Sequence, residues 1–120
     1  MHVIKISDVP KVHRENPIFT EPEQVTRQPL FPESKEYDIQ NMNFGKGVRN
    51  KFHTHANEQI LIVSAGKGIC ATETEERVVT VGDIIFFPAG EIHWHGAAPD
   101  SEFSHIYVHK KGTLLTQVEA

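Results

Sequence analysis

The pattern of apolar and polar residues predicts a succession of short β-strands from Glu36 onward. Residues 37–44 and 48–55 alternate between apolar and polar side chains, as strands with one buried face do. The other expected strands are separated by glycine, proline or acidic turns and comprise residues 59–65, 69–73, 77–81, 84–87, 92–96 and 102–109. No segment keeps the 3.6-residue period of an amphipathic helix, so we expect an all-β sandwich or barrel.

Composition supports a β structure and sets the first 35 residues apart. Val and Ile together number 22 against 4 Leu, and branched side chains fit strands better than helices. Five prolines interrupt the stretch between residues 8 and 36, namely Pro10, Pro17, Pro22, Pro29 and Pro32. We interpret residues 1–35 as an ordered, extended arm that packs on the barrel or on a dimer partner, with a flexible tail as the alternative. Residues 36–120 form the barrel itself.

Charge and hydropathy exclude two classes of partner. The 16 acidic residues outnumber the 12 basic ones, and no basic cluster is longer than Lys110-Lys111, which argues against nucleic-acid binding. The longest apolar run, residues 60–63, is far short of the roughly 20 residues that span a bilayer. A single cysteine, Cys70, and the absence of a leader-like first segment favour a cytoplasmic protein.

Six of the eight histidines fall between residues 53 and 109, in three pairs. The members of each pair lie an even number of residues apart, so they share one face of a strand. These pairs are His53 and His55, His93 and His95, and His105 and His109. Histidines that face an apolar interior are costly unless they are hydrogen-bonded or bind a metal, and neutral imidazole is a common metal ligand. The set therefore predicts a metal site inside the barrel.

Two spaced motifs resemble those of the cupin superfamily. The first has the pattern Gly47, five residues, His53-Thr54-His55, three residues, Gln59, six residues, Gly66. The second has the pattern Gly82, five residues, Pro88-Ala89-Gly90, two residues, His93. The resemblance implies a double-stranded β-helix (jelly-roll) barrel, here a single cupin domain preceded by the extended arm. It also implies one divalent transition metal per chain, supplied with ligands by both motifs.

The chain is similar, more narrowly, to the small cupins that include the manganese-dependent bacterial hydroxynitrile lyases. That similarity implies a metal held by four residues, His53, His55, Gln59 and His93. The position of Gln59 is usually a glutamate in cupins, and Glu58 stands immediately before it. Strand alternation favours Gln59 as the ligand if Ile60 and Ile62 face outward, because Glu58 then faces outward with them. An irregular turn before this strand would reverse that assignment.

The same similarity implies roles for residues around the metal. His105 is expected beside the metal as a proton-transfer residue, since histidine titrates near working pH. The similarity implies that the substrate pocket is lined by Gln40, Met42, Phe44 and His109. His95, which shares a face with His93, and Tyr107, which shares a face with His105 and His109, are expected there as well, with core packing as the alternative for Tyr107. Gln40 and Met42 are bulkier than the residues associated with these positions, and His109 replaces a glutamine, so the resemblance leaves the substrate open.

A set of three imidazoles and one amide is neutral, so the full charge of a divalent ion remains for a substrate oxygen. The similarity favours manganese, while iron, zinc and nickel suit the same ligands. We therefore expect a metalloenzyme of lyase type acting on a small molecule, like a hydroxynitrile lyase. The alternatives are an iron-dependent dioxygenase and a cupin that binds a small ligand without turnover.

The outer face of the predicted barrel carries apolar side chains. Ile60, Ile62, Ile84 and Phe86 alternate with residues assigned to the interior. An apolar sheet face of this kind is rarely left in water. Together with the arm, it predicts a homodimer with this face and the arm at the interface.

Overall fold

The structure is a computed structural model that describes residues 1–120, and it confirms an almost all-β chain. Its ten strands are β1 (Val12–His13), β2 (Val25–Leu30), β3 (Tyr37–Phe44), β4 (His53–His55), β5 (Gln59–Thr72), β6 (Glu76–Thr80), β7 (Ile84–Phe87), β8 (His93–Ala97), β9 (Phe103–Lys110) and β10 (Leu115–Gln117). Two 3-10 turns, η1 (Ile6–Asp8) and η2 (Pro22–Gln24), are the only helical elements. Neither has the length or apolar character of a membrane-crossing helix.

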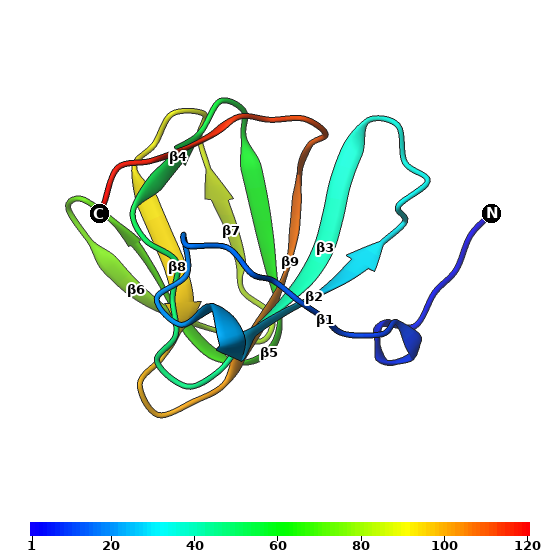
Figure 1. The fold of residues 1–120 in the computed structure, drawn as a ribbon, viewed down its shortest axis with the longest axis horizontal. Helices are drawn as coiled ribbons and strands as arrows, with labels where there is room; N and C mark the ends of the chain where they lie inside the picture. The colour runs from blue at the N-terminus through cyan, green and yellow to red at the C-terminus, as the bar shows by residue number, and fades with distance from the viewer.

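All strand pairs are antiparallel, and the sheet curls around a shared interior (Figure 1). Strand β5 contributes to both halves of the curled sheet. Residues 59–66 of β5 pair with β7 and β9, whereas residues 67–72 pair with β6 and β8. On the β9 side the order continues through β3 and β2 to β1, and on the β8 side through β4 to β10. This arrangement is the jelly-roll barrel that the sequence predicts.

The predicted turn at residues 66–68 is wrong, because β5 runs through it as one strand of 14 residues. A register shift between Val63 and Ala65 bends the strand, so that it can pass from one half of the sheet to the other. The glycines serve close packing instead. A Cβ on Gly68 would lie 2.6 Å from the Phe103 ring, and one on Gly66, with φ +70°, would meet the Glu102 carbonyl oxygen.

Two other predicted boundaries differ from the structure. The strand expected over residues 48–55 is reduced to β4, and only isolated bridges join Arg49 to Gly96 and Asn50 to Phe19. Strand β10 was not expected at all, because its side chains are exposed and show no alternation. It lies beside β4, where Leu115 pairs with His55.

Much of the arm packs on the sheet of its own chain, whereas the five residues before η1 are exposed (Figure 1). Strand β2 is hydrogen-bonded to β3 along its whole length, so this part of the arm is integral to the sheet. Pro29 is accommodated because β1 pairs only with Thr26 and Arg27, which leaves that side of Pro29 without a neighbouring strand. Ile18 and Phe19 of the arm are buried in the core.

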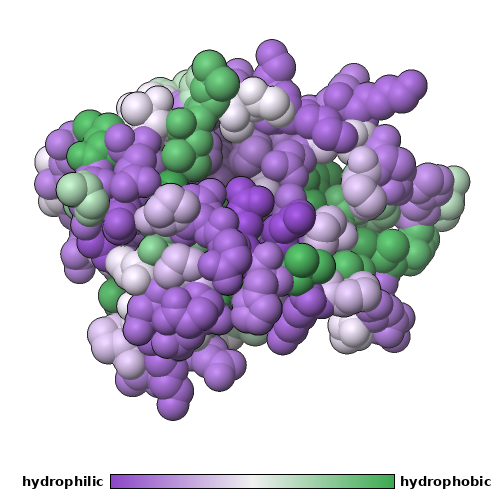
Figure 2. Space-filling model, viewed as in Figure 1, coloured by the Kyte–Doolittle hydropathy of each residue, from purple (hydrophilic) through white to green (hydrophobic).

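The apolar core and the buried histidines share the barrel interior. The Phe44 ring lies 5.8 Å from the Phe19 ring and 6.2 Å from the Phe103 ring. Leu61 and Val63 of β5 belong to the same core. The surface in the view of Figure 2 is mostly hydrophilic, with separate hydrophobic patches. Core side chains also contact the histidines directly, since the Phe87 ring lies 3.8 Å from the His93 ring.

Candidate metal centre

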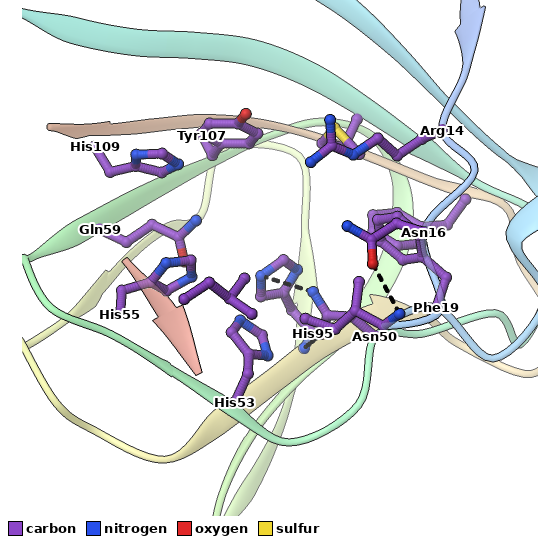
Figure 3. Close-up of a pocket in the computed structure, with 14 residues that line it drawn as sticks. Arg14, Asn16, Phe19, Asn50, His53, His55, Gln59, His95, Tyr107 and His109 are labelled. Carbon is purple, nitrogen blue, oxygen red and sulfur yellow. Dashed lines mark hydrogen bonds between the residues drawn. The ribbon is translucent and has the colours of Figure 1, made fainter. Parts of the chain in front are cut away.

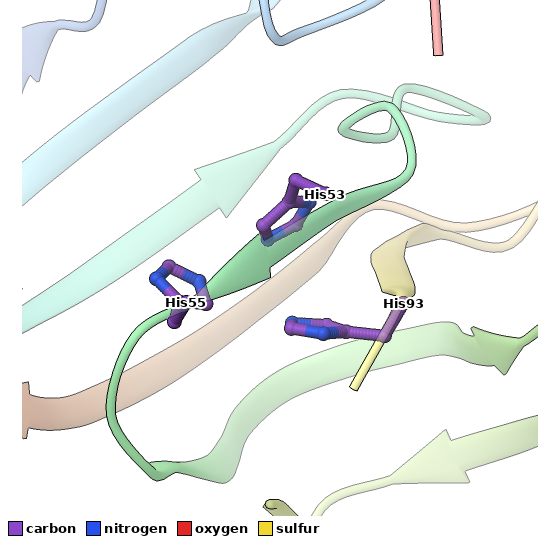
Figure 4. A group of neighbouring side chains, drawn as sticks. All are labelled: His53, His55 and His93. Carbon is purple, nitrogen blue, oxygen red and sulfur yellow. The ribbon is translucent and has the colours of Figure 1, made fainter. Parts of the chain in front are cut away.

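Three buried histidines converge inside the barrel. His53 and His55 project from the same face of β4, and His93 projects from β8, where it pairs in register with His53 (Figure 4). One ring nitrogen from each residue lies within 4.8 Å of the others. The alternation of β4 brings the first two residues together, and the β4–β8 pairing adds the third. This is the spacing that three ligands of one metal ion require.

Backbone carbonyl groups fix the orientation of two of these rings. His53 Nδ1 lies 2.7 Å from the Lys51 carbonyl oxygen, and His93 Nδ1 lies 2.8 Å from that of Glu91. A carbonyl oxygen only accepts, so each Nδ1 carries the hydrogen and each Nε2 presents a lone pair to the centre. A hydrogen bond from the second ring nitrogen is typical of metal-ligating histidines.

The remaining nitrogen and oxygen atoms of the centre have no partner within the chain. His93 Nε2, both ring nitrogens of His55 and the Gln59 side-chain oxygen are buried and unpaired. Such atoms are rare in folded proteins because each loses its hydrogen bonds to water. Figure 3 shows the Gln59 amide directed toward His55, whereas Glu58 is exposed on the outer face. A divalent cation would satisfy His93 Nε2, one ring nitrogen of His55 and the Gln59 oxygen together, so these residues fit a metal.

Burial keeps the three histidines neutral, which is the protonation state that a metal ligand needs. It lowers the pKa of His55 to about 3, with a further contribution from His53 and His93. Burial also lowers the pKa of His93 to about 4, although the Glu91 carbonyl opposes the shift. The pKa of His53 is lowered for the same reason.

A small cavity of about 80 Å³ opens beside the three histidines. Of the predicted pocket residues, five line it, namely Met42, Phe44, His95, Tyr107 and His109. Gln40 does not, because its side chain lies farther along β3, where it contacts Arg27 and Asp38. His105 is fully buried and also absent from the cavity wall. Among the expected ligands, His53, His55 and Gln59 face the cavity directly.

His95 stands between His105 and the cavity. His105 Nε2 is 3.1 Å from His95 Nδ1, and His95 Nε2 is 3.3 Å from Asn50 Nδ2. The His95 backbone N–H donates to Asn50 Oδ1 at 2.8 Å, which orients the amide so that its nitrogen donates to His95. It follows that His95 donates from Nδ1 to His105 Nε2. Burial lowers the pKa of both residues, that of His105 to about 4. The expectation that His105 titrates near working pH is therefore wrong, because a fully buried imidazolium loses its hydration.

Several cavity residues were missed in the sequence. Arg14, Asn16, Ile18 and Phe19 reach the cavity from the arm, Asn50 from the segment before β4, and Leu115 from β10 (Figure 3). Arg14 and Asn16 are two residues apart, so the alternation of an extended segment was the available signal. Leu115 had no such signal, since its position depends on the pairing of β10 with β4.

A curled antiparallel barrel with a neutral three-histidine centre defines a class of small metal-binding β proteins. Residues 40–109 match the cupin domain family, which is more than half of the chain. The chain therefore belongs to the cupin family, as its two motifs imply.

Named relatives and solved structures agree with this assignment. An (R)-mandelonitrile lyase from Granulicella tundricola is 39% identical over 74 residues, which are 59% of this chain and 55% of that protein. An acireductone dioxygenase from Parasynechococcus marenigrum is 32% identical over 65 residues, 48% of this chain and 35% of that protein. The chain thus spans about half or less of the length of these curated relatives.

Solved structures match nearly the whole chain. A cupin-like protein from Thermotoga maritima has a TM-score of 0.80 at 25% identity, covering 100% of this chain and 90% of that one. The polyketide cyclase RemF from Streptomyces resistomycificus has a TM-score of 0.87 at 17% identity, covering 100% of this chain and 87% of that one. These similarities support the fold, and their low identity carries no argument about activity.

Proposed function

We propose that this cupin is a divalent-metal-dependent enzyme of lyase type that acts on a small organic molecule, in the manner of a hydroxynitrile lyase. The observation that carries the proposal is the cluster of buried, unpaired acceptors on His55, His93 and Gln59, set beside a small cavity. The curated relative named as a mandelonitrile lyase supports the reaction class. Manganese is the proposed metal, held by His53, His55, Gln59 and His93.

Lysis of a cyanohydrin needs a base near the hydroxyl group and an acid near the departing cyanide. His53, His55, Gln59 and His93 would hold a divalent ion, which would supply a Lewis acid for a substrate oxygen. The hydroxyl proton passes to His95 Nε2, and the weak contact between this nitrogen and Asn50 is lost. His95 then transfers its Nδ1 proton to His105 Nε2, along the 3.1 Å contact between them. The carbon–carbon bond breaks, and its electron pair leaves with cyanide. His105 then returns a proton to His95 Nδ1, and His95 Nε2 gives one proton to cyanide, so the products are the carbonyl compound and HCN.

Burial keeps both relay residues neutral and makes an imidazolium on either of them short-lived. Burial holds the pKa of His95 well below its usual value, so His95 is neutral and able to accept a proton at pH 7. It does not retain that proton, because an imidazolium is poorly solvated at this depth. The same holds for His105, which has no contact with water.

Turnover of mandelonitrile by the metal-loaded protein tests the proposal. Benzaldehyde release should exceed the rate of the metal-free protein and of His93→Ala under the same manganese concentration. Benzaldehyde release that is equal in all three samples contradicts the proposal. The measurement should be made after elemental analysis of the protein as purified, which shows which metal it carries before any is added.

Iron-dependent dioxygenase activity is the second candidate. The relatives named as acireductone dioxygenases favour it, and a neutral three-histidine set with an amide leaves ligand positions open for two further groups. Oxygen uptake by the Fe(II)-loaded protein with small enediol or thiol substrates would support this reaction. A protein purified with manganese or zinc alone would weigh against it.

We further propose that the chain acts as a homodimer. Four apolar side chains form one exposed patch across β5 and β7, where Ile60 pairs with Phe86 and Ile62 with Ile84. Ile84 is 70% exposed and Phe86 is 54% exposed. A second copy that covers this patch would remove it from water, at roughly 25 cal/mol for each Å² of apolar surface buried.

A further inference from the structure

The cavity wall has a fixed positive charge that the proposed lysis of a neutral cyanohydrin does not use. Arg14 is its only permanently charged residue, and no aspartate or glutamate lines the cavity. The other polar groups of the wall are imidazoles, amides and the Tyr107 hydroxyl, which carry no fixed charge.

The Arg14 side chain has no partner within the chain. Its backbone N–H donates to the Val25 carbonyl oxygen at 3.0 Å, which anchors the residue at the end of β1. The guanidinium takes part in no hydrogen bond and no ion pair, although it is only partly exposed. Figure 3 shows it extending from the arm across the cavity toward Tyr107. Asp38 is occupied by other partners, since it accepts from Tyr107 at 3.0 Å and from Gln40 at 3.2 Å and lies 3.7 Å from His109 Nε2.

Asn16 offers a second donor from the same arm. Its Oδ1 accepts the Ile18 backbone N–H at 3.0 Å, so the amide nitrogen is turned the other way, into the cavity (Figure 3). That nitrogen donates to no atom of the chain. Arg14 and Asn16 thus present N–H groups on the wall opposite Gln59 and His55. Guanidinium and amide N–H groups at one place form a receptor for an oxyanion.

From these contacts we propose that Arg14 and Asn16 bind a carboxylate of the substrate, at the end away from the metal ligands. The inference rests on the proposed metal-dependent function and specifies its substrate class as small organic acids. The cavity of about 80 Å³ holds a few water molecules, which suits an acid of a few carbon atoms rather than a sugar phosphate. In this arrangement one oxygen function reaches the metal and a separate carboxylate reaches Arg14.

Binding of two matched probes tests the inference. Succinate and succinamate have the same carbon skeleton, and each can place one carboxylate at the metal. Only succinate has a second carboxylate for Arg14, since succinamate carries a neutral amide there. Titration calorimetry of the manganese-loaded protein at pH 7.5 should give succinate an affinity at least about tenfold higher than that of succinamate.

Three variants locate the source of that preference. Arg14→Gln should abolish the preference by lowering succinate affinity to about that of succinamate. Arg14→Lys should retain part of it, because the charge remains although the bidentate guanidinium geometry is lost. Arg27→Gln is the charge-matched control, since Arg27 lies on the neighbouring strand but outside the cavity, and it should keep the preference. Circular dichroism and thermal unfolding of each variant confirm that the fold is intact.

The outcomes separate this inference from the proposed function. If succinamate binds only in the presence of manganese, and succinate binds with the same affinity, the role given to Arg14 is wrong while the metal site stands. So does a succinate preference that survives Arg14→Gln. Succinamate binding that is independent of manganese contradicts the metal site instead. A wild-type protein that binds neither probe at millimolar concentration overturns the assignment of small acids.

Discussion

His105 reaches the cavity only through His95, because its Nε2 lies 3.1 Å from His95 Nδ1 and its own side chain is fully buried. The two rings meet edge to face, at an interplanar angle of 84°. His95 therefore lines the cavity, while Asn50 keeps the His95 hydrogen on Nδ1, where it is donated to His105. A change at either residue should affect proton movement without removing a metal ligand.

The first prediction concerns this pair. His105→Ala should leave manganese content near that of the wild type, because His105 contributes no atom to the three-histidine cluster. Turnover should fall by roughly 10²–10⁴-fold, the usual size of a general acid–base contribution. Metal content is measured by elemental analysis and turnover by benzaldehyde release. His105→Gln keeps an acceptor for the His95 Nδ1 hydrogen but cannot relay a proton, so it should stay slow.

The matched comparison is His93→Ala, which removes one of the expected ligands. It should lose metal as well as activity, since the two remaining histidines and Gln59 hold a divalent ion far less tightly. If His105→Ala strips the metal as thoroughly as His93→Ala, then His105 is a ligand and the assignment of the relay is wrong.

Replacing Gln59, the neutral fourth ligand, should change metal affinity and turnover in opposite directions. Gln59→Glu introduces a carboxylate that cancels one charge of a divalent ion. Manganese should bind more tightly, by about tenfold or more, while turnover falls because less charge remains to polarise the substrate. Metal competition with a chelator measures the first effect. A variant that turns over faster than the wild type would contradict the proposed use of the neutral ligand set.

The buried histidines should make the metal-free protein sensitive to mild acid. Their pKa values are lowered in the folded state, to about 3 for His55 and about 4 for His93 and His105. As pH falls below about 6.5, the unfolded chain takes up protons that the folded chain does not, so stability is lost. The contribution of these histidines to stability is fully present above about pH 6.5. It is lost progressively as the pH falls toward their folded-state pKa values.

Urea unfolding at pH 7 and pH 5 measures this effect. In that interval each such histidine lowers the free energy of unfolding by up to about 1.4 kcal/mol per pH unit. His105→Gln should reduce the slope, because it removes one of the titrating groups. A free energy of unfolding that is constant between the two pH values would contradict the neutral burial of the cluster.

Light scattering tests the proposed homodimer. The wild-type protein should have the mass of two chains at micromolar concentration. Ile84→Glu combined with Phe86→Glu should give a single-chain mass, because a carboxylate cannot be buried in an apolar interface without a partner. Val118→Glu serves as a control for an exposed apolar residue elsewhere. A wild-type protein with the mass of one chain would overturn the proposal.

Much of the barrel could be predicted from the sequence because one face of most strands is buried. Strands β3 and β7 have the predicted bounds, since alternation in β3 and turn residues around β7 define their ends. The same reasoning placed His53 and His55 on one face. It failed at residues 66–68, where the glycines are required by the Phe103 ring and by a bend rather than by a turn. That packing involves residues more than 30 positions apart.

The candidate site was predictable on the barrel and poorly predictable on the arm. Spacing identified His53, His55 and His93, and alternation chose Gln59 over Glu58, which the structure leaves exposed. The sequence could not show that His95 separates His105 from the cavity. Both side chains point to the barrel interior, and only the packing of the whole barrel determines which of them lines the cavity. Arg14 was missed because the conformation of its segment depends on the long-range pairing of β1 with β2.

The division of the cavity wall between arm and barrel has a consequence for how this protein can diversify. The residues that would hold the metal lie within residues 53–93, while Arg14 and Asn16 belong to a segment that precedes them by more than 30 positions. Mutation or recombination in the first segment can therefore alter which molecule is admitted without disturbing the reactive centre. A chimera that carries the first 20 residues of another cupin should exchange substrate preference while it retains its metal.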